Sequence, residues 1–401
     1  MNREEITKRV METFHTNKKL CLQFPTGTGK SLIALRLASS SDLNITNPDS
    51  GKKILILIAE RAHKQLWKDE FMKWGYESLL KDTLIMTYAS LHKVYGEYSV
   101  IIADEVHHLC TEKRLSLFLN LSSPVFIGLS ATVGRDRFRA LQEAIPDAML
   151  LSISLQETID KGILPDPEIN VIPLILDNTK PTQEIIKMRG KKEKRKVIHC
   201  TYREMWDYIK NKLTYPDIEL HVKCTEMQKY DAIDSEWYFW KQKYLTSRQE
   251  FMKNKWMLAG TQRKRYLGEL KTERVKELIE SLPKDERFIC FCTSIEQQIE
   301  LAKSYNYINS ELKDCQNVIN TFNEKRFNSL YCVGMAQEGL NLVDVPTGII
   351  VQLDAELRRF IQKAGRLLRA DHPRIYIFYY KHTRDEEFLE KVKELLPNIK
   401  K

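Results

Sequence analysis

The chain has 401 residues, a length that suggests two to three domains and a large buried core. Hydrophobic residues make up 43% and charged residues 29%, with 15 Gly and 13 Pro, which excludes the fibrous, disordered and membrane-embedded classes. Lys and Arg number 63 against 54 Asp and Glu, and the resulting net charge of +9 favours a polyanionic partner.

Short apolar runs alternate with helical patterns over the first 165 residues. Such alternation predicts a parallel sheet covered by helices. The longest run falls far short of the ~20 apolar residues of a membrane span, and the amino terminus has no apolar signal core, so we expect a cytoplasmic protein with no membrane partner. The runs are Leu20–Phe24, Ile54–Ala59, Thr83–Met86, Val100–Ala103 and Val125–Leu129.

The pattern breaks near residue 165, at Gly162, Pro165 and Pro167, and we expect a domain boundary there that separates residues 1–165 from 166–401. Strand signals thin out between about 180 and 272, where basic residues and four of the six tryptophans gather, and this change predicts a helical insertion. The sequence therefore predicts an α/β fold with two parallel-sheet units in tandem. The expected strands of the second unit are Glu168–Leu176, Phe288–Cys292, Leu330–Val333, Gly348–Leu353 and Ile375–Tyr380.

A glycine-rich turn follows the first predicted strand and precedes a helical pattern. Backbone N–H groups in such a turn and the positive end of the helix can bind a polyphosphate. Lys30 would then reach the β- and γ-phosphates, and Ser31 would offer its hydroxyl to Mg²⁺. Phe24 occupies the place of the first glycine of the G-x-x-x-x-G-K-[ST] motif, so a plain glycine-bearing turn is the alternative. The expected nucleotide-binding residues of the turn are Thr26, Gly27, Thr28, Gly29, Lys30 and Ser31.

Two adjacent carboxylates follow the strand Val100–Ala103. Asp104 and Glu105 should lie at the carboxyl end of a central strand, where parallel sheets place their ligands. Two carboxylates there need a cation, so Asp104 is expected to hold Mg²⁺ and Glu105 to polarise an attacking water, with His107 sensing the γ-phosphate. A solvated acidic turn is the alternative.

These motifs carry a resemblance to superfamily 2 helicases of the DExH type. The first unit has the phosphate loop, then Asp104-Glu105-Val106-His107, then Ser130-Ala131-Thr132 after an apolar strand. The second has Glu338–Leu342 in the place of motif V and Gln362–Arg369, which matches the Q-x-x-G-R-x-x-R box. Five motifs in this order are similar to the core of type III restriction and Swi/Snf motors, and the compact length suits a phage-encoded protein. The resemblance implies two RecA-like lobes.

The resemblance also implies the roles of further residues. ATP and Mg²⁺ would bind between the lobes, with Gln362 and Gly339 beside the nucleotide and Arg366 and Arg369 as arginine fingers on the developing charge. Ser130 and Thr132 would couple hydrolysis to movement. The residues expected to contact nucleic acid are Arg61, Thr87 and Thr293.

The predicted insertion carries an apolar stripe at helical spacing. A stripe of this kind packs on the second lobe or, alternatively, exposes an aromatic ring that stacks on bases. Basic residues at 187–196 and 263–265 either track a nucleic-acid backbone or form a solvated surface. The stripe consists of Met227, Tyr230, Ile233, Trp237, Trp240 and Tyr244.

The resulting hypothesis is an ATP-dependent nucleic-acid motor, in the first place a DNA helicase. A duplex translocase without net unwinding, an RNA helicase, and a nucleic-acid-binding module with a vestigial ATPase site are the alternatives. The partner is expected to be DNA rather than RNA, and protein partners in replication, recombination or restriction stay open.

Overall fold

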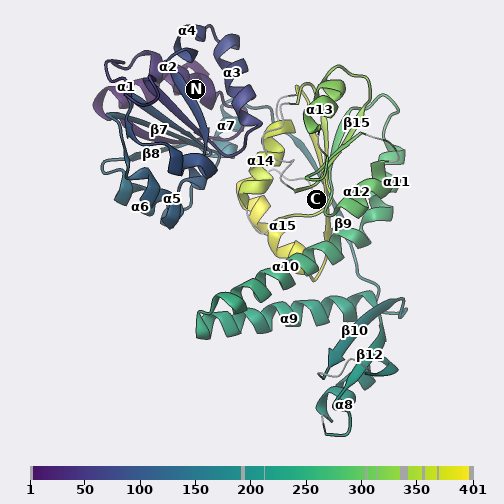
Figure 1. The fold of residues 1–401 in the computed structure, drawn as a ribbon. Helices are drawn as coiled ribbons and strands as arrows, with labels where there is room; N and C mark the ends of the chain where they lie inside the picture. The colour runs from purple at the N-terminus through teal and green to yellow at the C-terminus, as the bar shows by residue number, and fades with distance from the viewer. Residues whose placement is uncertain are drawn as a thin grey trace.

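The computed structural model describes residues 3–396 except 191–194, 212, 303, 305, 313, 335–341, 355–356 and 368–369, and leaves out the side chains of 357–359 and 366. The described chain forms two large sheets and a smaller part that projects from the second sheet (Figure 1). None of its helices is both long and apolar enough to cross a membrane.

The first sheet is six-stranded and parallel, in the order β3-β2-β5-β7-β1-β8. Its strands are β1 (Lys19–Gln23), β2 (Ile54–Ile58), β3 (Thr83–Thr87), β5 (Val100–Asp104), β7 (Val125–Ser130) and β8 (Met149–Ser152). The helices of this part are α1 (Arg3–Thr16), α2 (Lys30–Ser39), α3 (His63–Lys73), α4 (Glu77–Leu80), α5 (Glu112–Phe118), α6 (Arg135–Ala144) and α7 (Leu155–Asp160). Two 3₁₀ turns, η1 (Tyr88–Lys93) and η2 (Val106–His108), and a short strand pair, β4 (Gly96–Glu97) with β6 (Leu121–Ser122), complete this part.

Both faces of the first sheet are covered, and the strands show why. Successive side chains of a strand point to opposite faces, and β2 is apolar at every position. Ile54, Ile56 and Ile58 join the core under α1, α2 and α3, whereas Leu55 and Leu57 join the core under η1, α5 and α6. A strand buried on both faces is therefore a continuous apolar run without alternation, as the sequence predicts.

The second sheet is also six-stranded and parallel, in the order β14-β15-β13-β16-β17-β9. Its strands are β9 (Glu168–Leu174), β13 (Phe288–Phe291), β14 (Tyr307–Ile308), β15 (Ser329–Cys332), β16 (Thr347–Ile350) and β17 (Arg374–Tyr380). Its helices are α11 (Thr272–Ser281), α12 (Ile295–Ala302), α13 (Cys315–Asn323), α14 (Leu357–Leu367) and α15 (Arg384–Leu395).

The segment between β9 and α11 differs from the expected helical insertion. Its first part forms a three-stranded sheet, β10 (Gln183–Arg189), β12 (Ile218–Cys224) and β11 (Lys196–Thr201), with α8 (Tyr202–Lys210). The prediction of an all-helical segment is therefore wrong over 183–224, because no residue of β10 is fully buried and its exposed face carries the apolar Ile186 and Met188, so the strand lacks a clear apolar-polar alternation. The helical prediction is correct for the rest, where α9 (Glu226–Ser247) and α10 (Glu250–Leu270) form a long antiparallel hairpin (Figure 1).

Candidate functional site

The glycine-rich turn joins β1 to α2 in a left-handed backbone. Gly27 and Gly29 have φ of +92° and +90°, a region that only glycine enters without strain. Lys30 folds its ammonium back into the turn, where it donates to the carbonyl oxygens of Phe24 at 2.9 Å and Pro25 at 3.2 Å. Thr28 donates to the Pro25 oxygen at 2.8 Å. The hydrogen bonds of Thr28 and Lys30 thus close the loop on itself, and the Lys30 ammonium can leave these carbonyls to contact an anion.

The N-terminal end of α2 fits an anionic group. Gly29 precedes the helix, and no side chain among the described residues caps its first turn. A Cβ built on Gly29 meets nothing within 4 Å, so the space over the turn is open. Unpaired N–H groups at a helix start bind phosphate oxygens. The geometry therefore fits a polyphosphate held by the Gly27–Ser31 backbone.

Phe24 replaces the first glycine of the motif because the strand continues through it. Its ring is 1% exposed and packs in the core under α1 and α2. Its N–H donates to the Ser130 carbonyl at 3.0 Å, which extends the pairing of β1 with β7 by one residue. The chain turns only after Pro25, so the position needs no glycine.

The acidic pair lies at the carboxyl end of β5, between β2 and β7. Trp67 on α3 donates its indole N–H to Asp104 Oδ2 at 2.9 Å, and the Tyr88 hydroxyl donates to the Asp104 carbonyl at 2.7 Å. Glu105 has φ of +48°, a left-handed conformation, and its carboxylate lies near Ser130 and His107. The two neighbouring carboxylates are therefore held by different partners.

A hydrogen-bond network joins Glu105 to the end of β7. The Ser130 hydroxyl lies 3.2 Å from Glu105 Oε2 and 3.0 Å from His107 Nδ1, and His107 Nδ1 lies 3.3 Å from the same carboxylate oxygen. Ser130 also contacts the Thr132 backbone, at 2.9 Å to the carbonyl and 3.3 Å to the N–H. The structure thus brings together Glu105, His107, Ser130 and Thr132.

The surroundings shift the pKa values of the two carboxyls in opposite directions. Burial, followed by the negative charge of Glu105, raises the pKa of Asp104. Burial also acts to raise the pKa of Glu105, but the hydrogen bond from His107 and the charge of Lys30 outweigh it and lower that pKa to about 2. Glu105 is therefore an anion at neutral pH, and Asp104 gains most from a nearby cation.

Helix α14 of the second sheet meets the glycine-rich turn of the first. A Cβ built on Gly365 lies 2.8 Å from Thr26 Cβ and 3.0 Å from the Thr26 carbonyl oxygen, so only glycine allows this approach. The Gly365 carbonyl oxygen lies 3.4 Å from the Cβ position of Gly27. On the same helix Gln362 is buried. Helix α14 and the glycine-rich turn are thus in contact at Gly365.

Three predicted residues lie partly or wholly outside the described chain. Arg366 belongs to α14, but its side chain is among those left out, and Arg369 and Gly339 lie outside the described residues altogether. Their roles stay predictions.

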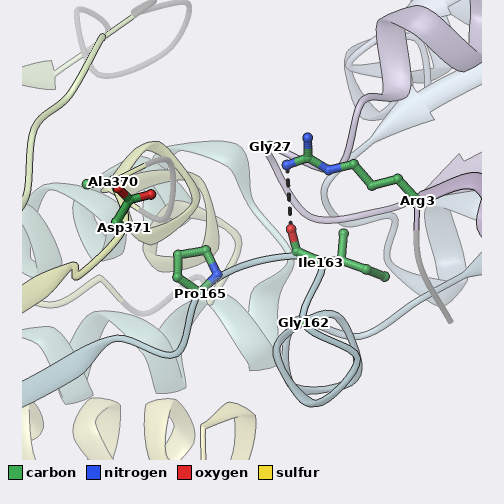
Figure 2. A pocket seen from close by; sticks show the side chains of 7 residues that line it. All are labelled: Arg3, Gly27, Gly162, Ile163, Pro165, Ala370 and Asp371. Atoms are coloured by element: carbon green, nitrogen blue, oxygen red, sulfur yellow. Dashed lines mark hydrogen bonds between the residues drawn. The ribbon is translucent and has the colours of Figure 1, made fainter.

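A cavity of about 350 Å³ opens beside this contact. It is lined by the glycine-rich turn at Gly27, by α1 at Arg3 and by the chain after α14 (Figure 2). The Arg3 guanidinium points toward it and donates to the Ile163 carbonyl at 3.5 Å. The remaining lining residues are Gly162, Pro165, Ala370 and Asp371.

The three residues predicted to contact nucleic acid lie in different settings. Arg61 is exposed between β2 and α3, and Thr87 ends β3, where it hydrogen-bonds Ser90 at 3.0 Å. Both lie at the carboxyl edge of the first sheet. The hydroxyl oxygen of Thr293 is buried against Gly268 of α10. Thr293 therefore packs the second sheet on the hairpin in this structure.

Sequence reasoning missed several residues of the site. Trp67 and His63 come from α3, and nothing in their spacing marks them because they read as the buried face of a helix. His63 is 6% exposed, its Nε2 has no hydrogen-bond partner among the described residues, and its charge acts on Asp104. Arg3 and Gly365 were also missed as cavity and contact residues, which only the packing of the two sheets identifies.

The donor set fits a magnesium nucleotide. Carboxylate and hydroxyl oxygens are ligands that Mg²⁺ prefers. Asp104, at the carboxyl end of β5, supplies the carboxylate, and Ser31, in the first turn of α2 after β1, supplies the hydroxyl. Among the described residues the Asp104 carboxylate accepts its hydrogen bond through Oδ2, which leaves Oδ1 for a cation. Lys30 acts electrostatically on both Asp104 and Glu105, so the turn and the acidic pair are close neighbours.

Two family models match the chain. Residues 2–135 match the model described as type III restriction enzyme, res subunit, and residues 270–371 match the helicase conserved C-terminal domain. A curated relative, DNA 3'-5' translocase XPB2 of Sulfurisphaera tokodaii, is 22% identical over 364 residues, which cover 88% of this chain and 75% of that protein.

Solved helicase structures share the fold. The Pyrococcus furiosus Hef helicase domain aligns over 98% of this chain and 97% of its own, with a TM-score of 0.52 and 14% identity. S. cerevisiae Dbp5 bound to RNA and ADP BeF3 aligns over 96% and 84%, with a TM-score of 0.57 and 11% identity. Both confirm the α/β prediction of two helicase-like parallel-sheet units. The chain belongs to superfamily 2 of the helicases and translocases, and it is an ATP-hydrolysing nucleic-acid motor of that superfamily.

Proposed function

We propose that this chain is a Mg²⁺-dependent DNA motor with two lobes, residues 1–165 and 166–401, that close on ATP. The observation that carries the proposal is the contact of Gly365 with Thr26 and Gly27, because it joins the phosphate-binding turn of one sheet to the arginine-bearing helix of the other. Closing and opening at this contact would move the two lobes relative to each other once per ATP.

In this proposal the first lobe binds the phosphates. The backbone of Gly27–Ser31 holds the polyphosphate, and Lys30 leaves the carbonyls of Phe24 and Pro25 to contact the β- and γ-phosphates. Glu105 stays ionised because its pKa is low, and it orients the attacking water as an acceptor. Mg²⁺ bound by Ser31 and Asp104 would neutralise phosphate charge.

The second lobe supplies positive charge to the reaction. Arg366 lies on α14, the helix that meets the turn, and Arg369 follows it two residues after the helix ends. We assign both to the phosphate oxygens, where a planar guanidinium can bind two oxygens at once. In related NTPases an arginine in this role contributes about 10³ to 10⁵ in rate.

The cavity beside Gly27 would take the adenosine part of ATP. Arg3 lines it from one side and Asp371 from the other, so the cavity offers both a hydrogen-bond donor and an acceptor (Figure 2). Arg3 also ties α1 to the chain between the sheets through the Ile163 carbonyl. This places a nucleotide-reading role on α1, where the sequence has no obvious adenine-reading Gln.

Ser130 and Thr132 would pass the state of the ATP site to the nucleic acid. Ser130 contacts Glu105 and His107 on one side and the Thr132 backbone on the other, so a change at the γ-phosphate can reach the end of β7. Arg61 and Thr87, at the same sheet edge, are the proposed contacts to the strand.

DNA is the proposed track because the curated relative from Sulfurisphaera tokodaii is named a DNA translocase. The same name favours movement along DNA over net unwinding. RNA is the alternative track, since Dbp5 was solved with RNA on the same fold.

Steady-state ATP hydrolysis tests the proposal. It is measured with Mg²⁺ alone and with single-stranded DNA, duplex DNA, forked DNA and RNA, beside Glu105→Gln. We expect stimulation by DNA that the variant abolishes. Stimulation by RNA alone would transfer the proposal to an RNA helicase, and no hydrolysis with any nucleic acid would refute the motor.

A further inference from the structure

The helical hairpin of α9 and α10 extends well beyond the sheet on which it rests (Figure 1). Its root is buried, because Tyr230, Tyr266 and Leu267 pack with Tyr380 of β17. With 22 residues, α9 is about 33 Å long at 1.5 Å per residue. The Trp237 ring still lies under Arg384 of the second lobe, at 5.0 Å, and the part of the hairpin beyond it, residues 238–258, projects away from the second lobe (Figure 1).

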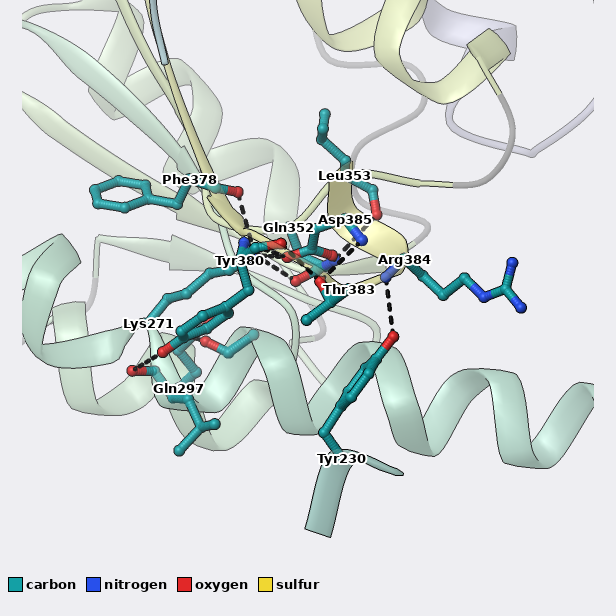
Figure 3. A network of polar contacts seen from close by, with 12 residues as sticks. Tyr230, Lys271, Gln297, Gln352, Leu353, Phe378, Tyr380, Thr383, Arg384 and Asp385 are labelled. Carbon is teal, nitrogen blue, oxygen red and sulfur yellow. Dashed lines mark hydrogen bonds and ion pairs between the residues drawn. The ribbon is translucent and has the colours of Figure 1, made fainter. Parts of the chain in front are cut away.

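The root is held rigidly by a buried polar network (Figure 3). Lys271, between α10 and α11, is fully buried and donates to Asp385 Oδ2 at 2.6 Å, Gln352 Oε1 at 2.7 Å and the Phe378 carbonyl at 3.1 Å. Tyr230 of α9 accepts a hydrogen bond from the Arg384 N–H at 2.9 Å. These bonds fix the direction in which the hairpin projects.

Aromatic rings also join the two helices of the projecting half. Trp256 of α10 lies between Trp237 and Tyr244 of α9, with ring centroids 6.1 and 5.8 Å away. The apolar stripe predicted from the sequence is thus divided: its first residues pack on the second lobe, Trp237 and Tyr244 pack on Trp256 of the partner helix, and Trp240 lies beside Phe239 and Phe251. The stripe explains the stiffness of the hairpin but does not explain its outer surface.

The outer surface carries a row of aromatic rings, Phe239, Trp240 and Phe251, which we call the aromatic ridge. Phe239 contacts Trp240 edge-on at 5.1 Å, and Trp240 contacts Phe251 edge-on at 6.3 Å, so the ridge crosses from α9 to α10. Phe239 is 50% and Phe251 59% exposed. Rings this exposed in the middle of two stable helices contribute little to folding and are typical of a binding surface.

Positive charge surrounds the ridge. Lys243 lies over the Phe239 ring at 5.6 Å, and Lys255 lies over the Phe251 ring at 5.7 Å. Neither lysine forms an ion pair with a carboxylate among the described residues. Residues 237–258 contain five cations, Lys241, Lys243, Arg248, Lys253 and Lys255, against the single carboxylate of Glu250.

The basic residues 263–265, at the root of the hairpin, pair with carboxylates, unlike the two lysines beside the ridge. Arg263 pairs with Asp234, Lys264 with Asp354, and Arg265 with Glu269 and Glu296. These cations are engaged within the protein and hold the hairpin in place. From the sequence, these residues were expected either to contact a nucleic-acid backbone or to form a solvated surface. Because they are paired within the protein, the lysines of the ridge are better placed to contact such a backbone.

We propose that the aromatic ridge binds an unpaired nucleic-acid strand. Its bases stack on Phe239 and Phe251, and its phosphates contact Lys243 and Lys255. The charge favours this partner, because exposed rings flanked by unpaired lysines match a ligand with planar bases on an anionic backbone. The proposal rests on the proposed function, and it adds a strand-binding surface made of residues outside the candidate ATP site.

The test measures binding of a fluorescent oligothymidine to the whole chain, without ATP, over a range of salt. Phe239→Ala with Phe251→Ala should weaken binding about 30-fold, since two stacked bases at about 1 kcal/mol each correspond to that factor. Tryptophan at both positions should restore binding. Trp206→Ala removes a ring that is 48% exposed on α8 and should leave binding unchanged.

The lysines have a separate readout. Lys243→Gln with Lys255→Gln should lower the slope of log K against log salt by about 1.4, or about 0.7 for each phosphate contact of a single strand. Lys8→Gln with Lys391→Gln, two exposed lysines elsewhere, should leave the slope unchanged.

Several outcomes would overturn the proposal. Unchanged oligothymidine binding in the alanine pair would exclude stacking on the ridge. If the alanine pair loses self-association in sedimentation but keeps strand binding, the ridge is a contact with a second copy of the chain and not a strand-binding surface. Because binding is measured without ATP, a ridge that binds in a chain that hydrolyses no ATP would refute the motor and leave this inference standing.

Discussion

Substituting Gly365 by alanine adds a single methyl group at the contact between the two lobes. The new methyl group would lie 2.8 Å from Thr26 Cβ and 3.0 Å from the Thr26 carbonyl oxygen, closer than carbon atoms approach without displacement. The neighbour that must move is backbone of the phosphate-binding turn. We therefore expect the lobes to close less readily, and the turn to be displaced when they do.

The magnitude follows from two opposing effects. Alanine within a helix is favoured over glycine by about 0.5–1 kcal/mol, so α14 itself should gain stability. Overpacking at a close contact costs about 1–3 kcal/mol, and this cost arises only when the lobes meet. If ATP hydrolysis requires that contact, kcat/KM for ATP should fall about 5- to 150-fold while the unfolding midpoint stays equal or rises.

The assay compares steady-state hydrolysis and thermal unfolding of wild type, Gly365→Ala and Gly134→Ala. Gly134 is the matched control, because its φ is negative and a Cβ there meets nothing within 4 Å. Hydrolysis by Gly365→Ala equal to that of the control would refute the role of the contact. A lowered unfolding midpoint would show that the loss comes from misfolding.

Three further predictions concern other parts of the molecule. Trp67→Phe removes the N–H that stabilises the ionised Asp104, so the already raised pKa of Asp104 should rise further. The acid limb of the rate-against-pH profile should then move to higher pH, which hydrolysis assays from acid to neutral pH will detect. Lys271→Met leaves Asp385 buried without its charged partner and should destabilise the fold by about 3–5 kcal/mol in urea unfolding, whereas Arg274→Met, at an exposed pair, should leave the urea midpoint nearly unchanged. Ser130→Ala removes the hydroxyl between Glu105, His107 and Thr132, so translocation should fall about tenfold and hydrolysis less; an equal fall in both would argue against coupling.

Much of the fold could be predicted because buried parallel strands are apolar without interruption. Val100–Ala103 and Ile54–Ala59 were expected as strands and form β5 and β2, with ends shifted by one residue. β10 and β12 escaped prediction for different reasons. β12 buries only alternate residues, with polar residues between them, and β10 has no fully buried residue and exposes the apolar Ile186 and Met188. Short β8 was missed for a similar reason, since none of its four residues is fully buried.

The candidate site was predictable where chemistry requires a residue type in a fixed order along the chain. Gly27, Gly29 and Lys30 are of this kind, because a phosphate-binding turn needs positive φ and a cation next to a helix start. Trp67 and Arg3 are not, because each reaches the site from a helix whose sequence shows only its amphipathic face. Phe239 was overlooked beside the regular stripe of Trp237 and Trp240, since helical periodicity identifies the packed face of a hairpin rather than its exposed one.

The central claim is that ATP hydrolysis at the acidic pair drives movement along DNA. ATP-driven displacement of a third strand from duplex DNA measures this movement directly. It is compared for the wild type and Glu105→Gln on two DNA substrates, each of which blocks movement in one of the two directions. We expect displacement by the wild type only, with ATP and Mg²⁺ present. A wild-type chain that hydrolyses ATP on DNA and displaces no strand, or displacement by Glu105→Gln, would contradict it.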